Sequence, residues 1–261
     1  MEIQHQSPLF RLLSPDLRLC IYEMILSDPR RLMHIMIFAR DLKLVHSWCH
    51  DEDSPLPICQ HLCYGHPYID RDAGGYAAQI DLPGSKDGFV NLLLSCRRIY
   101  YEALEILYKN NIFHFRGSPR LLAFHKSIPT AQWQAIRYLH MSTTFKPPWP
   151  NEAELWHFPA DSWEDWDETC ALLNGMQLKS LRFDIAHVPR SPSFPVEEMG
   201  DKAMIAILEP LKMLEAENFE VEINFRLSSA VEKYFKDAPF AVVFKKRTLS
   251  YSPPRGRIRC R

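Results

Sequence analysis

Glycine is scarce in this sequence, and the short motifs that identify many enzyme active sites are missing. Only nine of the 261 residues are glycine. There is no glycine-rich phosphate loop, Gly-x-Ser-x-Gly elbow, His-Glu-x-x-His pair or Cys-x-x-Cys pair. The sequence therefore argues against the nucleotide-binding, hydrolase, zinc-protease and thioredoxin-like enzymes that depend on these motifs.

The chain also lacks an excess of charge of either sign and any long hydrophobic run. Its 31 Lys and Arg residues and 32 Asp and Glu residues leave a formal net charge of -1, so we expect no nucleic-acid or membrane partner. The longest apolar stretches, within residues 31–38 and 89–94, are much shorter than the roughly 20 residues that cross a membrane. Residues 1–14 do not have the pattern of a secretory signal.

The seven cysteines follow no regular framework, and their number is odd. Free or metal-bound thiols fit this pattern better than disulfides do, which indicates a reducing compartment. We therefore expect an intracellular protein that resides in the cytoplasm or the nucleus.

Hydrophobic residues make up 46% of the chain, which predicts a folded protein. Apolar residues repeat with helical spacing in some segments and alternate or form short runs in others. Predicted strands follow predicted helices along the chain, so we expect the α+β or α/β class, as an irregular α/β layer or a degenerate leucine-rich repeat. The helices are predicted within 15–26, 89–110, 118–128, 162–176 and 201–216, and the strands within 30–39, 112–115, 135–141, 178–188 and 219–227.

The first of these helices has a well-marked start. Ser14 is suited to cap it, Pro15 to occupy its first position, and Asp16 to interact favourably with the helix dipole. Apolar residues then recur at helical spacing, here and in segment 89–110. The residues that we expect in the core of the N-terminal region are Leu13, Leu17, Ile21, Leu93, Ile99 and Leu107.

Two separate segments of the N-terminal region form a recognisable signature. The first is LLSPDLRLCIYEMIL and the second is NLLLSCRRIYYEALEILYKNNIFHF. They resemble the opening and closing parts of the F-box-like families that abound in filamentous fungi. The positions that carry the resemblance are Pro15, Asp16, Leu17, Arg18, Ile21, Tyr22 and Glu23, followed by Cys96, Arg97, Tyr100, Glu102, Ala103, Leu107, Tyr108, Asn111 and Phe113.

The F-box-like resemblance implies a non-catalytic interaction module that recruits substrates for ubiquitin ligation. Its helices would contact the adaptor subunit of a cullin-type ligase. The resemblance covers residues 8–115, and residues 28–88 form an insertion that separates the two halves, which are nearly continuous in an F-box. We therefore expect one compact unit with an F-box-like region over 1–116, an α/β region over 117–248 and a basic tail over 249–261.

The stretch HSWCHDEDSPLPICQHLCYGH within the insertion holds three cysteines and four histidines. Zinc is usually bound by four such side chains, supplied as two closely spaced pairs. Cys59 and Cys63 form one candidate pair, and Cys49 with His46 or His50 forms the other, with His61 and His66 as alternates. The candidate set for structural zinc is Cys49, Cys59, Cys63 and His66. The alternative is a loop with no metal or other cofactor, whose thiols and imidazoles pack under the helices.

Aromatic residues gather in the middle of the α/β region, around the proline-rich loop 145–166. Such residues can line an apolar pocket for a small molecule, or they can fill the end of the core. We favour the core, and the pocket candidates are Trp133, Phe145, Trp149, Trp156, His157, Trp163 and Trp166.

Two classes of function remain after these exclusions. The first is the F-box-like interaction module, which would bind a protein partner through its helices. The second is a cofactor-independent isomerase or cyclase of fungal secondary metabolism, for example a Diels-Alderase that orients an apolar substrate. Such an enzyme needs no metal and no nucleophile, so it would leave no motif. A filled core with an exposed apolar patch near Leu9, Phe10 and Leu13 favours the module, and a closed pocket under the tryptophan-rich loop favours the enzyme.

Overall fold

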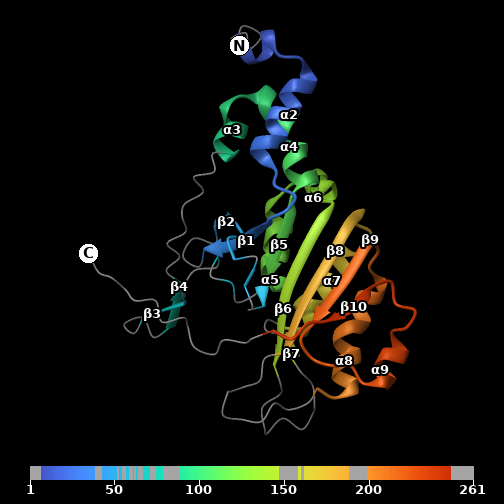
Figure 1. The fold of residues 1–261 in the computed structure, drawn as a ribbon. Helices are drawn as coiled ribbons and strands as arrows, with labels where there is room; N and C mark the ends of the chain where they lie inside the picture. The colour runs from blue at the N-terminus through green and yellow to red at the C-terminus, as the bar shows by residue number, and fades with distance from the viewer. Residues whose placement is uncertain are drawn as a thin grey trace.

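The computed structural model of the chain is built around one mainly parallel β-sheet (Figure 1). The residues that the structure describes are 7–38, 43–51, 53–54, 57–58, 61, 63, 67–70, 75–78, 89–146, 158–159, 162–187 and 199–247. The strands of the sheet are β1 (Leu32–Phe38), β2 (Lys43–Trp48), β5 (Ile112–Arg116), β6 (Tyr138–Lys146), β7 (Phe158–Pro159), β8 (Leu178–His187), β9 (Ala216–Ile223) and β10 (Ala241–Phe244). This architecture confirms the predicted α+β or α/β class.

The strand order along the sheet is β10-β9-β8-β6-β5-β1-β2, and β7 pairs with β6. From β1 to β10 the pairs in this path are parallel, whereas β2 and β7 run antiparallel to their neighbours. Strands from both predicted regions, 1–116 and 117–248, therefore share one sheet. A separate antiparallel hairpin consists of β3 (Pro67–Asp70) and β4 (Gly75–Ala78).

Helices cover the apolar face of the sheet. They are α5 (Ser118–Ser127), α6 (Thr130–Ala135), α7 (Trp163–Leu173), α8 (Asp201–Leu208), the 3-10 helix η4 (Glu209–Met213) and α9 (Ser229–Tyr234). Two rows of side chains, in register across the parallel strands, form that face and belong to the hydrophobic core. The rows are Met33, Phe113, Leu139, Leu181 and Phe219, and Ile35, Phe115, Met141, Phe183 and Val221.

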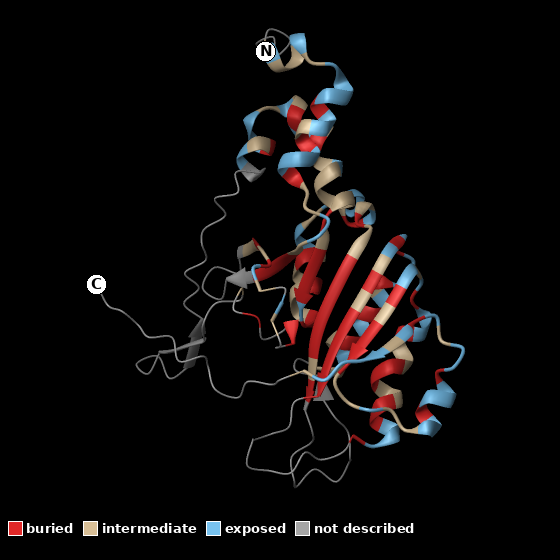
Figure 2. Cartoon of the chain, in the orientation of Figure 1, coloured by how far each residue is buried: buried red, intermediate tan, exposed pale blue. Residues whose placement is uncertain are grey.

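The opposite face of the sheet is polar, although it is also buried. Because side chains alternate along a strand, the residues between the apolar rows project to this face. One row contains His34, His114 and His140, and the next contains Ser142, Asp184 and Glu222. Figure 2 shows the buried colouring continuing across the central strands.

The N-terminal helices project beyond one end of the sheet (Figure 1). They are α1 (Pro8–Leu12), α2 (Pro15–Leu26), α3 (Phe89–Ser95) and α4 (Arg97–Asn110). Ser14 caps α2 as predicted, and its side chain accepts a hydrogen bond from the Leu17 amide. The single predicted helix 89–110 is instead two helices, because the chain is extended at Cys96, whose thiol caps α4.

The core predicted for the N-terminal region is correct only in part. Leu93 and Ile99 are buried, but Leu17 is 54% exposed. The reason is that α2 buries only a narrow stripe of Arg18, Tyr22 and Leu26. We predicted that the apolar positions of α2 face the core. Leu17 does not, because it lies outside the buried stripe.

Single residues mark several of the boundaries between helices, strands and loops. Gly175 follows the end of α7 with a positive φ of 85°, a conformation that glycine adopts readily. The predicted helix 201–216 changes to the 3-10 helix η4 at Glu209, directly before Pro210, which has no amide hydrogen to donate. Segment 70–88 is dense in glycine and aspartate, a composition that predicts a loop, yet strand β4 lies inside it.

Candidate functional site

The two halves of the N-terminal signature meet in the structure, despite the insertion between them. Nε and Nη2 of Arg18 on α2 donate hydrogen bonds of 2.9 Å and 2.8 Å to the two carboxylate oxygens of Glu102 on α4. The Tyr22 hydroxyl and the Arg98 guanidinium also donate to Glu102. The Arg18 guanidinium and its neighbours lower the pKa of the Glu102 carboxyl to about 2, against the opposing effect of burial.

Asn111 makes a second connection between these helices. Its Nδ2 donates to the carbonyl oxygens of Leu26 (2.7 Å) and Leu107 (2.9 Å), and its Oδ1 accepts from the Asp28 amide (3.1 Å). It therefore joins the ends of α2 and α4 to the turn that leads into β1. Four signature residues therefore hold α2 against α4 from buried or partly buried positions: Arg18, Tyr22, Glu102 and Asn111.

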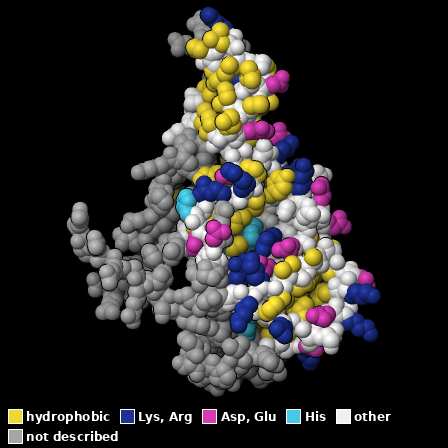
Figure 3. Space-filling view, in the orientation of Figure 1, with side chains coloured by type: hydrophobic (Ala, Val, Ile, Leu, Met, Phe, Trp, Pro, Cys, Tyr) yellow, Lys and Arg dark blue, Asp and Glu magenta, His cyan; other side chains and the backbone are white. Residues whose placement is uncertain are grey.

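The outer surface of these helices is rich in exposed apolar side chains. Met24 is 84% exposed, Tyr101 78% and Leu94 74%. Figure 3 shows hydrophobic side chains gathered over this projection. We call the surface formed by these side chains the helical surface; its members are Leu12, Leu17, Leu19, Met24, Ile25, Leu94, Tyr100 and Tyr101. Leu9, Phe10 and Leu13, whose exposure would favour the interaction module, are half-buried instead.

A cluster of four metal-ligating side chains lies within insertion 28–88. His34 comes from β1, Cys49 directly follows β2, and His61 and Cys63 come later in the segment after β2. One ligand atom from each residue lies within 4.8 Å of the ligand atoms of the other three. Cys49 and His61 are buried, His34 is fully buried, and Cys63 is half-buried.

Pairing between β1 and β2 brings His34 and Cys49 to one face. His34 is paired with Ser47, and Cys49 lies two residues beyond Ser47, where the ladder continues with a hydrogen bond from its amide to the Leu32 carbonyl. Because side chains alternate along a strand, the imidazole and the thiol project to the same side. His46 is paired with Ile35 and therefore belongs to the other face.

Polar contacts fix the chain around Cys49. The Arg31 guanidinium donates to the Cys49 carbonyl oxygen and lies 2.9 Å from Nδ1 of His50. The His50 amide donates to Sγ of Cys63 at 3.2 Å. Hydrogen bonding with Cys49, His34 and the His50 amide lowers the pKa of the Cys63 thiol. A lower pKa favours the thiolate, which is the form of cysteine that binds metal ions.

The cluster agrees in part with the metal ligands that we predicted. It contains Cys49, Cys63 and the alternate His61, whereas Cys59 and His66 lie outside the described residues. His50 contacts Arg31 instead of joining the cluster. Sequence reasoning missed His34, although a lone histidine in the apolar strand LMHIMIF was a usable signal.

The aromatic pocket candidates that the structure describes lie in the core. Trp133, Phe145 and Trp166 are buried, and Trp163 is half-buried with its ring centroid 5.8 Å from that of Phe145. Trp149, Trp156 and His157 lie outside the described residues. The basic tail 249–261 also lies outside them.

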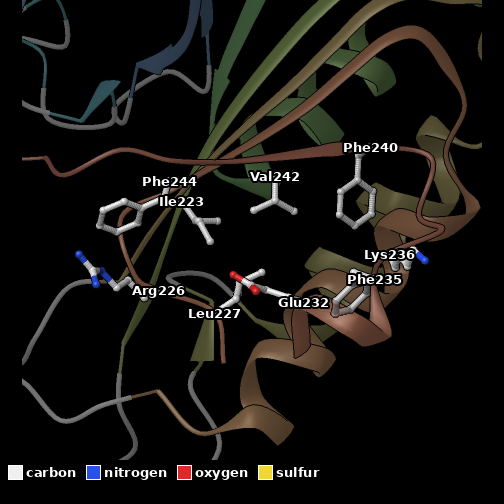
Figure 4. Close-up of a pocket in the computed structure, with 9 residues that line it drawn as sticks. All are labelled: Ile223, Arg226, Leu227, Glu232, Phe235, Lys236, Phe240, Val242 and Phe244. Carbon is white, nitrogen blue, oxygen red and sulfur yellow. The ribbon is translucent and has the colours of Figure 1, made fainter. Parts of the chain in front are cut away.

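A cavity of about 620 Å³ lies at the far end of the sheet, between β9, α9 and β10 (Figure 4). Its aromatic walls are Phe235, Phe240 and Phe244, and Arg226, Glu232 and Lys236 also line it. None of the pocket candidates that the structure describes, Trp133, Phe145, Trp163 and Trp166, lines this cavity.

Among the helices that the structure describes, none has the length and hydropathy required to cross a membrane. Comparison with curated proteins and with solved structures found no match. Residues 2–242, however, match the family described as a domain of unknown function (DUF7730). This match spans most of the chain, so the protein belongs to the DUF7730 family.

Proposed function

We propose that this protein is a non-catalytic interaction module that binds a partner protein through the helical surface. The observation that carries the proposal is the burial pattern of α2. Most residues of PDLRLCIYEMIL are apolar, yet only Arg18, Tyr22 and Leu26 are buried. A helix that is apolar on most sides is normally covered on those sides, so the exposed residues favour a binding surface.

The resemblance to F-box-like families suggests the partner. Arg18 and Glu102 hold α2 against α4, so the signature residues support one helical unit despite the insertion 28–88. We infer that the partner is the small acidic adaptor subunit of a cullin-type ubiquitin ligase, in the cytoplasm or the nucleus. The remainder of the chain would then select the substrate.

The test is a binding titration of the purified chain with the recombinant adaptor subunit. We expect a 1:1 complex, and we expect Met24→Lys to weaken it at least about tenfold, because a charge would be buried at the interface. Met213→Lys is the matched control, since Met213 is also an exposed methionine (50%) but lies on η4. The control should bind as the natural sequence does, and circular dichroism should confirm that both variants fold.

Two results would contradict this proposal. One is the absence of binding at micromolar concentrations of both proteins. The other is equal affinity for the chain with Met24 and for Met24→Lys.

The cofactor-independent isomerase or cyclase remains the alternative, with less support. Trp133, Phe145 and Trp166 pack within the core, where they favour a structural role over a pocket wall. If the protein is such an enzyme, its apolar ligand would bind in the cavity between β9, α9 and β10. Native mass spectrometry after exposure to a cell extract would then show a retained organic molecule.

A further inference from the structure

We propose that His34, Cys49, His61 and Cys63 bind one zinc ion, which fastens the segment after β2 to the polar face of the sheet. All four side chains lie within insertion 28–88, but they come from different places in it: His34 from β1, Cys49 from directly after β2, and His61 and Cys63 from further along the chain. This inference does not depend on the proposed function, because the cluster and the helical surface share no residues.

Two of the distances between the ligand atoms are close to those of a zinc tetrahedron. Zinc–sulfur bonds of about 2.3 Å and zinc–nitrogen bonds of about 2.05 Å place two sulfurs about 3.8 Å apart, and a sulfur and a nitrogen about 3.6 Å apart. In the structure, Sγ of Cys49 lies 3.8 Å from Sγ of Cys63 and 3.5 Å from Nδ1 of His61. The ligand atoms of all four residues lie within 4.8 Å of one another, so small side-chain shifts bring the other pairs to the spacing that the ion requires.

The chemistry of the four ligands favours zinc over other common ions. Two thiolates and two imidazoles suit zinc, whereas magnesium and calcium prefer oxygen ligands. When Zn²⁺ binds, two zinc–sulfur bonds form and the two thiols release their protons to solvent. The resulting site carries no net charge, which makes its burial less costly than that of bare thiolates.

Contacts around the cluster resemble the supporting shell of a structural metal site. Nδ1 of His34 lies 2.9 Å from Nδ1 of His114, so a hydrogen bond to the neighbouring strand fixes the orientation of His34. This bond leaves Nε2 of His34 as the atom that binds the metal. The amide of His50 donates to Sγ of Cys63, which orients the sulfur.

The ion would hold the segment after β2 across the sheet. Ile58, between Cys49 and His61 in the sequence, donates its amide hydrogen to Oδ2 of Asp184 on β8 at 3.3 Å. This segment thus contacts β1 through the cluster and β8 through Ile58. Four filled ligand positions leave none for a substrate, so the site has a structural role.

A disulfide between Cys49 and Cys63 is the competing use of the two thiols. Their sulfurs are 3.8 Å apart, well beyond the S–S bond length of about 2.05 Å. Neither cysteine forms a disulfide in the structure. A reducing compartment, which we expect from the cysteine pattern, would also keep them reduced.

The test is to measure metal content and cysteine protection on the full-length protein. The chain purified from zinc-supplemented cells should contain one zinc ion per molecule by elemental mass spectrometry. With zinc bound, Cys49 and Cys63 should resist alkylation, and a chelator should make both reactive. Cys20, an exposed thiol on α2, should react under both conditions and serves as the internal control.

Variants and a spectroscopic probe complete the test. Cys63→Ser should lower zinc affinity at least about tenfold in competition with a chelator, whereas Cys20→Ser should leave it unchanged. Co²⁺ added to the metal-free natural chain should give the intense visible bands of a tetrahedral site with thiolate ligands. This measurement needs no variant, so it remains informative if Cys63→Ser fails to fold.

The proposal would be overturned by any of three results. The first is a protein without zinc and without a tetrahedral Co²⁺ spectrum. The second is zinc-dependent protection of Cys59 in place of Cys63. The third is a Cys49–Cys63 disulfide in protein that was purified without exposure to oxidants.

Discussion

Arg18 and Glu102, which are 84 positions apart in the sequence, form a bidentate ion pair with N–O distances of 2.9 Å and 2.8 Å. The pair joins α2 to α4, and the Arg18 side chain is nearly fully buried. Both residues belong to the two-part signature of the N-terminal region. Their contact explains how two segments on either side of a long insertion become one helical unit.

Glu102→Gln should destabilise the protein at neutral pH by about 1 to 2 kcal/mol. The glutamine loses charge-assisted hydrogen bonds to Arg18 and Arg98, and partial solvent exposure of Glu102 (24%) limits the loss. The measurement is urea denaturation of both proteins at pH 7. Glu105→Gln is the control on the same helix, because Glu105 pairs with Lys109 at the exposed surface and should contribute little.

The effect of Glu102→Gln should also depend on pH. The folded-state pKa of Glu102 is about 2, below its ordinary 4.5, so the carboxylate stabilises the fold above pH 4.5. That contribution decreases as the pH falls toward 2. The difference between the two proteins should therefore be smaller at pH 3.5 than at pH 7, and a constant difference would contradict this explanation.

Asn111→Ala should destabilise the protein by about 3 kcal/mol. The substitution removes three hydrogen bonds and leaves the carbonyl oxygens of Leu26 and Leu107 without this donor in a buried place. Thermal denaturation would measure the effect. The matched control is Asn110→Ala, because Asn110 donates only a 3.3 Å bond to Glu23 at the surface. Equal losses of stability for the two variants would show that the hydrogen bonds of Asn111 do not hold the ends of α2 and α4 together.

Asp184→Asn should stabilise the protein above pH 6, by about 2 kcal/mol. Burial, and then the charge of Glu222, raise the pKa of the Asp184 carboxyl to about 6, against the effects of the Ile58 amide, Arg247 and Arg182. A carboxyl with a raised pKa binds its proton more tightly in the folded state, so stability falls as the pH rises from 4 through 6. Asparagine carries no charge and retains an oxygen that accepts from Ile58.

Urea denaturation of Asp184→Asn and the natural sequence at pH 4 and pH 7.5 would check this prediction. The advantage of the variant should appear at pH 7.5 and nearly vanish at pH 4. A variant that is less stable at pH 7.5 would mean that the Asp184 charge is better solvated than its burial indicates.

The order of helices and strands was largely predictable because local signals agreed with the fold. Ser14 caps α2, Gly175 adopts the positive φ after α7, and alternating residues in β9 face the core. The break between α3 and α4 was not predictable from periodicity, since the apolar spacing continues through Cys96. The exposure of Leu17 depends on which side of α2 meets α4, and the helical pattern alone does not determine that.

The candidate metal ligands were predictable only where they are close in sequence. Cys49, His61 and Cys63 fall within the stretch rich in cysteine and histidine. His34 joins them because β1 and β2 pair with His34 opposite Ser47, and register between strands is a tertiary property. The polar face of the sheet could likewise not be predicted from the sequence, because its histidines are far apart in the chain and meet only through parallel strand pairing.

Site-specific photo-crosslinking to the adaptor subunit tests the central claim most directly. A photoreactive phenylalanine analogue would replace Met24 on the helical surface or, as the control, Met213 on η4. We expect a crosslinked 1:1 product for position 24 and none for position 213. A crosslink at position 213 alone, or none at either position when both proteins are folded, would contradict binding through the helical surface.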